Sequence, residues 1–161
     1  MEYKIRHAQL EDLPRIEAIY AYARQFMAEH GNPNQWGSSY PKHTMLLDDI
    51  EKRLLYVMIQ GDSIHGVFYF YIGQDPTYVQ IFDGTWCSNS VYGTIHRIAG
   101  DGTGGILGAA VAYCRTFCSH LRIDTHEDNY VMQKAILKQG FSRRGIVYME
   151  DGTPRIAYEL L

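Results

Sequence analysis

The chain has few of the features that mark secreted, membrane-spanning or nucleic-acid-binding proteins. Only three of its 161 residues are cysteines (Cys87, Cys114 and Cys118), and no two of them have Cys-x-x-Cys spacing. This usage argues against a disulfide framework and favours a reducing, cytoplasmic location. No run of about 18 apolar residues is present, so no membrane-spanning helix is expected. The N-terminus also lacks the apolar core of a signal peptide.

An excess of charge of one sign is missing too. The formal net charge is −3, and the lysines and arginines are scattered singly along the chain. We therefore expect neither nucleic acid nor a membrane surface as a partner. What the chain does have is an ordinary globular composition, 46% apolar and 20% charged, over a length typical of one domain. This predicts a single domain, residues 1–161.

The periodicity of apolar residues predicts an α/β fold, with a central mixed sheet of about seven strands flanked by four helices. Strands are predicted over 3–6, 54–59, 64–72, 94–99, 120–124, 144–149 and 155–160, with a further short strand at 78–82. Helices are predicted from residue 11 to 31, over 41–53 and 106–118, and from 128 to 140.

A glycine-rich turn, Gly100-Asp-Gly-Thr-Gly-Gly105, lies between a predicted strand and a predicted helix. Such a turn brings free backbone N–H groups and the positive end of a helix dipole to one point. The result is an anion site, and its usual ligand is phosphate. A Walker loop is excluded, because no lysine follows the glycines at the required spacing.

Dinucleotide binding is one alternative for this turn. Gly100, Gly102 and Gly105 match the spacing Gly-x-Gly-x-x-Gly, and Asp124 ends the next strand about 19 residues later, near where a ribose-binding acid is expected. Only about 35 residues follow Asp124, however, which is too few for the second mononucleotide-binding half of that fold.

Four segments form a second, more specific pattern. They are Ile5-Arg-x-Ala-x-x-x-Asp-Leu13, residues 104–113, residues 123–129 and Lys138-Gln-Gly-Phe141. In this order and spacing they resemble the GNAT superfamily of acyl-CoA-dependent N-acetyltransferases, over nearly the whole chain. The resemblance implies a GNAT-like fold and acetyl-CoA as the co-substrate. It also implies direct transfer of the acetyl group to a primary amine of a small molecule or an amino-acid-like compound.

The resemblance also implies where coenzyme A would bind. The pantetheine arm is expected against Ile98, on the edge of strand 94–99, and against Asn129, which is also a candidate cap of the next helix. The pyrophosphate is expected at the backbone of the turn and the helix start, namely Gly102, Thr103, Gly104, Gly105, Ile106, Leu107 and Gly108.

The chain departs from the family pattern at three positions. Gly102 stands where the family has a basic or amide side chain, and Leu107 stands where it has a small residue. Ile136 stands where many members have the tyrosine that protonates the leaving thiolate. These departures favour a second hypothesis, a coenzyme A-binding module without catalysis that serves as a sensor or a partner subunit.

His96 is the candidate general base, because it lies on the strand that should face the substrate and histidine titrates near neutral pH. A structural role for His96 is the alternative. Tyr92 and Tyr148 are candidate proton donors.

Three polar residues follow strand 120–124 closely. Asp124 and His126 could supply an acid, whereas Asp128 is expected to cap the next helix. No metal site is expected from these three residues, because their spacing is irregular and a fourth ligand is missing.

Trp36, Tyr40 and Trp86 are candidates for lining the pocket of the acceptor amine, with Tyr69 and Tyr71 beside them. Core packing is the alternative for the tyrosines. No motif identifies the acceptor, and a homodimer stays open as the oligomeric state.

Overall fold

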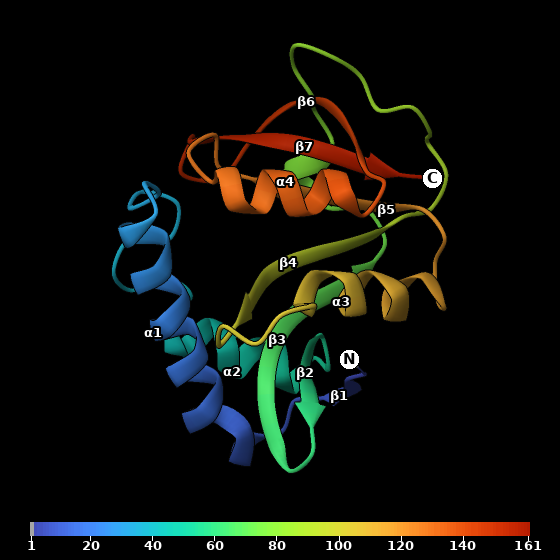
Figure 1. Cartoon of the computed structure of the whole chain (residues 1–161). Helices are drawn as coiled ribbons and strands as arrows, with labels where there is room; N and C mark the ends of the chain where they lie inside the picture. The colour runs from blue at the N-terminus through green and yellow to red at the C-terminus, as the bar shows by residue number, and fades with distance from the viewer. Residues whose placement is uncertain (1) are drawn as a thin grey trace.

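The computed structural model describes residues 2–161, which form one seven-stranded sheet (Figure 1). The strands follow the order β1-β2-β3-β4-β5-β7-β6. Only β4 and β5 are parallel, and every other neighbouring pair is antiparallel. The strands are β1 (Lys4–His7), β2 (Leu55–Gln60), β3 (Ser63–Ile72), β4 (Gly93–Gly100), β5 (Leu121–Thr125), β6 (Ser142–Tyr148) and β7 (Pro154–Leu160). The predicted mixed sheet is confirmed, and this pairing excludes a dinucleotide-binding fold, whose sheet is mostly parallel.

Four α-helices cover the two faces of the sheet: α1 (Leu13–Glu29), α2 (His43–Glu51), α3 (Ile106–Arg115) and α4 (Tyr130–Lys138). Side chains alternate along the strands, so that Val57 and Met58 belong to different apolar cores. Helices α1 and α2 pack on the Val57 side, and α3 and α4 pack on the Met58 side. In the described residues, none of the helices is long and apolar enough to cross a membrane.

The predicted strand at 78–82 is wrong. A short 3-10 helix, η2 (Pro76–Tyr78), occupies the start of this segment, and the Asp75 side chain caps it by accepting a hydrogen bond from the Thr77 N–H at 2.9 Å. Phe82 forms only an isolated bridge with Ile146. An aspartate followed by proline favours a capped turn, and this local chemistry overrides the strand propensity of the residues after it.

Two helix boundaries also differ from the prediction. Of the two candidate caps of α4, Asn129 is confirmed and Asp128 is wrong, because the Asn129 side chain accepts a hydrogen bond from the Met132 N–H at 3.1 Å. The Asp128 N–H is instead directed at the His126 ring, 3.0 Å away. Helix α3 ends at Arg115 rather than at residue 118.

The pairing between β4 and its parallel neighbour β5 is short. Gly93 and Thr94 pair with β5, and the described pairing of the two strands goes no further. Beyond that point β4 contains a bulge, where Arg97 and Ile98 together oppose Phe68 of β3. Beyond the bulge, β4 continues toward α1, and the loop after it leads back to α3 (Figure 1).

Arg97 is held at the centre of this bulge with a positive φ of 52°, which is uncommon for a residue with a side chain. Its guanidinium donates to Asp49 of α2 at 2.8 Å, and the Tyr20 hydroxyl of α1 donates to its carbonyl at 2.6 Å. The two helices therefore fix the bulge from one face of the sheet.

A buried polar cluster around Glu159 connects β7 to β6 and to the residue before β5. Glu159 of β7 is 1% exposed and accepts hydrogen bonds from the Cys87 N–H, from His120 Nε2 and from Arg144 Nε, at 2.8, 2.6 and 2.9 Å. Burial by itself would raise the pKa of Glu159, but these hydrogen bonds outweigh burial and lower the pKa.

Replacing Glu159 by glutamine should therefore destabilise the fold strongly. The variant leaves His120 and Arg144 without their carboxylate, so we expect the free energy of unfolding to fall by about 3 kcal/mol. In calorimetry this corresponds to a melting temperature lowered by roughly 6–12 °C. Glu150→Gln, a change at an exposed residue of the β6–β7 turn, is the matched control and should melt like the wild type. Equal melting of the two variants would contradict the role of the cluster.

Candidate active site

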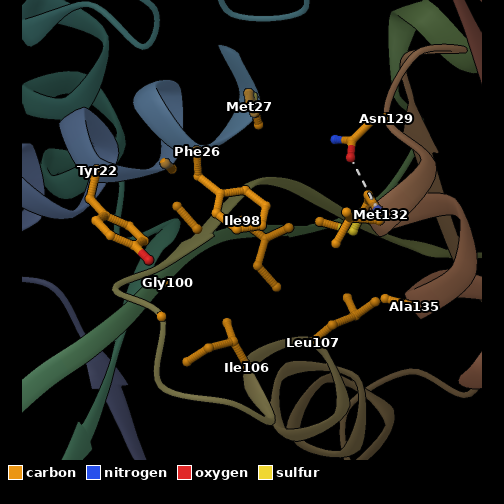
Figure 2. Close-up of a pocket in the computed structure, with 14 residues that line it drawn as sticks. Tyr22, Phe26, Met27, Ile98, Gly100, Ile106, Leu107, Asn129, Met132 and Ala135 are labelled. Atoms are coloured by element: carbon orange, nitrogen blue, oxygen red, sulfur yellow. Dashed lines mark hydrogen bonds between the residues drawn. The ribbon is translucent and has the colours of Figure 1, made fainter. Parts of the chain in front are cut away.

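An apolar pocket opens where β4 and β5 separate (Figure 2). Its walls come from four elements: α1, the end of β4, the start of α3 and the start of α4. The residues labelled in Figure 2 are Tyr22, Phe26, Met27, Ile98, Gly100, Ile106, Leu107, Asn129, Met132 and Ala135. The pocket thus joins the glycine-rich turn at one end to the β4 bulge and the α4 cap at the other.

The glycine-rich turn has the geometry of an anion site. Gly105 precedes α3 in the left-handed conformation, with φ of 80°. The first N–H inside the helix to find a partner is that of Ala109, which donates to the Gly105 carbonyl. The N–H groups of Ile106, Leu107 and Gly108 therefore lie at the positive end of the helix without an intrahelical acceptor.

Backbone access to this turn is open at Gly104, where an added Cβ would meet nothing within 4 Å. The Thr103 N–H, by contrast, donates to Asp101 Oδ1 at 3.1 Å. This removes Thr103 from the expected phosphate donors, because its N–H is used within the turn.

Asp101 places a negative charge inside the turn, where one cation and one histidine bind it. Arg15 of α1 and His65 of β3 both reach Asp101 Oδ2 at 2.7 Å. Burial would raise the pKa of Asp101, but the hydrogen bonds from Thr103 and His65 outweigh it and lower the pKa. The carboxylate is therefore matched by the nearby Arg15 charge, which reduces its repulsion of an anion.

In the middle of β4, His96 lies between two carboxylates. His96 Nε2 is 2.7 Å from Asp75 Oδ2, and His96 Nδ1 is 3.7 Å from Asp124 Oδ2. The Tyr78 hydroxyl donates to Asp124 Oδ2 at 2.5 Å. Because Asp75 accepts at hydrogen-bond distance, it favours the His96 tautomer with the proton on Nε2, and Nδ1 then faces Asp124.

The environment shifts the pKa values of the groups around His96. Burial would raise the pKa of Asp75, but hydrogen bonds from His96 and Thr77 outweigh burial and lower the pKa to about 2. Burial and the nearby Asp124 charge raise the pKa of Tyr78 well above its ordinary value. Asp75 is therefore ionised and Tyr78 neutral near pH 7.

An aromatic wall lies next to His96. The Tyr69 ring is 5.7 Å from the His96 ring between centroids, and the Arg97 guanidinium lies 4.4 Å above Tyr69. Arg97 also reaches the Tyr40 hydroxyl at 3.4 Å, and the Tyr40 ring is 6.0 Å from Trp36. Tyr40 and Trp36 thus connect to His96 through Arg97 and Tyr69.

Solved structures share this architecture. A GNAT family acetyltransferase from Streptococcus agalactiae is 28% identical, with 99% of this chain and 95% of the other covered and a TM-score of 0.87. A GNAT family acetyltransferase from Bacillus cereus is 19% identical, with 99% and 96% covered and a TM-score of 0.62. A ribosomal-protein-alanine N-acetyltransferase from Brucella melitensis is 18% identical, with 98% and 99% covered and a TM-score of 0.61.

The chain is therefore similar, in fold and over nearly its whole length, to GNAT family acetyltransferases. No protein-family model and no curated protein matches the sequence, so the relationship rests on structural similarity. At the level of the family, the activity is acetyl transfer.

The pocket brings together several of the residues proposed for coenzyme A. Ile98, Gly102, Ile106, Leu107 and Asn129 all line it. Asn129 lies there because its side chain caps α4 and also donates to Gln35 at 3.0 Å. Ile136, at the family's tyrosine position, is fully buried in the core and carries no acidic proton.

The two proposed proton donors lie in different places. The Tyr92 hydroxyl accepts the Asp75 N–H at 2.8 Å, and Asp75 in turn contacts His96. Tyr92 therefore stays a candidate proton donor. Tyr148 is on β6, three strands from β4 in the sheet order, or roughly 14 Å at normal strand spacing. Tyr148 packs against Phe82.

Trp86 is also placed differently from the expectation. Its Nε1–H donates to the Tyr78 carbonyl at 2.9 Å, and Arg122 lies 3.9 Å above its ring. Trp86 therefore packs against Tyr78 and is not part of the aromatic wall next to His96. Across residues 2–161, no group of three or more histidine, cysteine, aspartate or glutamate side chains could hold a metal ion.

The sequence does not identify Asp75 and Tyr78 as neighbours of His96. Tyr78 begins the wrongly predicted strand 78–82, and Asp75 lies in the polar segment before it. The Asp-Pro pair is the signal that could have identified the turn, but nothing in the sequence shows that the turn folds over β4.

The hydrogen bonds that His96 and Thr77 make to the Asp75 carboxylate predict a specific acid sensitivity. The pKa of Asp75 is about 2 in the fold against 3.8 when unperturbed, so its ionisation contributes about 2 kcal/mol of stability. This contribution is complete above about pH 4 and is lost as the pH falls toward 2.

Asp75→Asn should therefore lower the free energy of unfolding at pH 7 by about 2 kcal/mol, with about half of that difference left near pH 3. Urea unfolding at both pH values measures it. Asp62→Asn, at an exposed residue of the β2–β3 turn, should change neither value. A difference at Asp75 that is independent of pH would refute the stabilising role of its ionised carboxylate.

Proposed function

We propose that this chain is an acetyl-CoA-dependent N-acetyltransferase that acetylates a primary amine of a small molecule or an amino-acid-like compound by direct attack. The observation that carries the proposal is the early separation of β4 from β5. As a result, an anion site, an apolar pocket and a histidine–carboxylate pair follow one another along β4.

The residues present suit coenzyme A. The N–H groups of Ile106, Leu107 and Gly108 would hold the pyrophosphate at the start of α3, with Gly104 leaving room for it. The apolar walls of the pocket suit the pantetheine arm. The edge of β4 beyond Thr94 has no strand partner on the β5 side, so the amides of the arm could pair with it in the manner of an added strand.

Bound acetyl-CoA would supply a thioester, whose carbonyl carbon is open to attack by an amine. A backbone N–H near Ile98, in the β4 bulge, is placed to polarise the carbonyl oxygen. The C–N bond forms as the C–S bond breaks, and the acetyl group passes to nitrogen without a covalent enzyme intermediate.

His96 would prepare the amine. Only the neutral amine attacks, so a proton must leave the ammonium first, and His96 Nδ1 is the nitrogen with a free lone pair. Asp124 faces that nitrogen and would attract the ammonium beside it. Asp75 would stabilise the imidazolium that forms.

The second amine proton leaves nitrogen after attack and ends on the departing sulfur. A thiol has a pKa near 8.5, so its thiolate is a stable leaving group near neutral pH. This is why a chain with Ile136 in place of a tyrosine can still carry out the transfer. The buried Ile136 is also the observation that favours a non-catalytic coenzyme A-binding module as the second candidate function.

Turnover separates the two functions. Against a panel of primary amines, the wild type should release free thiol from acetyl-CoA, and His96→Gln should lower kcat by roughly 10²–10⁴-fold because the general base is lost. Binding of acetyl-CoA should persist in this variant. His43→Gln, which alters an exposed histidine of α2, should retain full activity. Unchanged turnover in His96→Gln would refute the base assignment, and a wild type that binds acetyl-CoA but acetylates no amine would favour the binding module.

A charge placed at the turn tests the anion site. Gly104 has open space around it and needs no positive φ, so Gly104→Asp adds a negative charge with little strain. Gly104→Asn has nearly the same shape without the charge. We expect the aspartate to weaken binding of acetyl-CoA by at least ten-fold relative to the asparagine in calorimetric titration. Equal affinities would place the phosphates elsewhere.

A further inference from the structure

The polar side chains around the glycine-rich turn are almost all engaged with the protein itself. Arg15 donates to Asp101 and to the Ile64 carbonyl, and His65 is also bound to Asp101. The Tyr3 hydroxyl donates to the Gly104 carbonyl at 2.7 Å. These groups shape the turn and neutralise Asp101, but each already has a partner.

The Tyr22 hydroxyl is different. Tyr22 belongs to α1, lines the pocket and is 44% exposed, and no hydrogen bond of its hydroxyl occurs in the described part of the chain. Figure 2 shows this hydroxyl directed at the turn that follows Gly100. A Cβ built on Gly102 would lie 2.8 Å from the Tyr22 oxygen. The hydroxyl therefore occupies the space into which a side chain at position 102 would extend.

The Tyr22 ring is also held in place before any ligand arrives. It stacks on Phe26, one turn later in α1, with 6.5 Å between centroids, and Phe26 stacks on His30 at 3.9 Å. A phenol fixed by its ring loses little conformational entropy when its hydroxyl forms a hydrogen bond.

We infer that the Tyr22 hydroxyl is a phosphate-binding group of this site, donating a hydrogen bond to the pyrophosphate of acetyl-CoA from α1, across from the N–H groups of α3. This inference rests on the proposed function and adds a side-chain donor to an otherwise backbone site. It also accounts for Gly102, because any side chain there would displace the hydroxyl.

The test compares two acetyl donors in calorimetric titration. Acetyl-CoA carries the pyrophosphate, and S-acetylpantetheine carries the same thioester arm with no phosphate. Tyr22→Phe keeps the ring and removes only the hydroxyl. We expect its affinity for acetyl-CoA to fall roughly ten-fold, as for a lost hydrogen bond to a charged group, and its affinity for S-acetylpantetheine to stay unchanged. Tyr130→Phe, at an exposed tyrosine of α4 that lies outside the pocket lining, is the control and should bind both donors like the wild type.

The outcomes distinguish this inference from the proposed function. If the wild type binds acetyl-CoA and Tyr22→Phe binds it equally well, the role of Tyr22 is overturned and the proposed function stands. Equal losses for both donors would also overturn it, since they would point to ring packing. A wild type that does not bind acetyl-CoA would overturn both.

Discussion

The separation of β4 from β5 after two residue pairs is the constraint on which the site depends. If β4 and β5 kept pairing beyond these residues, β5 would cover the edge of β4 and the pocket would be closed. The bulge at Arg97 and Ile98 redirects the strand, and its positive φ is tolerated because Asp49 and Tyr20 hold Arg97 from two helices. Backbone strain at this point is thus offset by an ion pair and a hydrogen bond, an arrangement often found at functional sites.

The two parts of β4 differ in charge, and the difference matches the proposed reaction. The end of β4, between α1 and α3, offers backbone N–H groups and an Asp101 charge that Arg15 compensates, which suits a phosphate-bearing donor. The middle of β4 has Asp75 and Asp124 around His96, which suits a cationic amine that must lose a proton. Donor and acceptor can therefore meet along β4.

Much of this arrangement could be predicted from the sequence, because local signals specified it. The strand–turn–helix pattern around Gly105 located the anion site, and the order of four short motifs indicated the fold. The contacts of His96 could not be predicted, since Asp75 and Tyr78 reach it through a turn whose position depends on tertiary packing. The tyrosines at 92 and 148 were chosen by residue type alone, and the sheet order places one against Asp75 and the other on a distant strand.

The most direct test of the central claim is calorimetric titration of the wild-type protein with acetyl-CoA, with NAD as the comparison ligand. The open edge of β4 and the start of α3 predict saturable binding of acetyl-CoA at one site per chain and no binding of NAD. Binding of NAD, or of neither ligand, would contradict the assignment of the β4–β5 opening as a coenzyme A site.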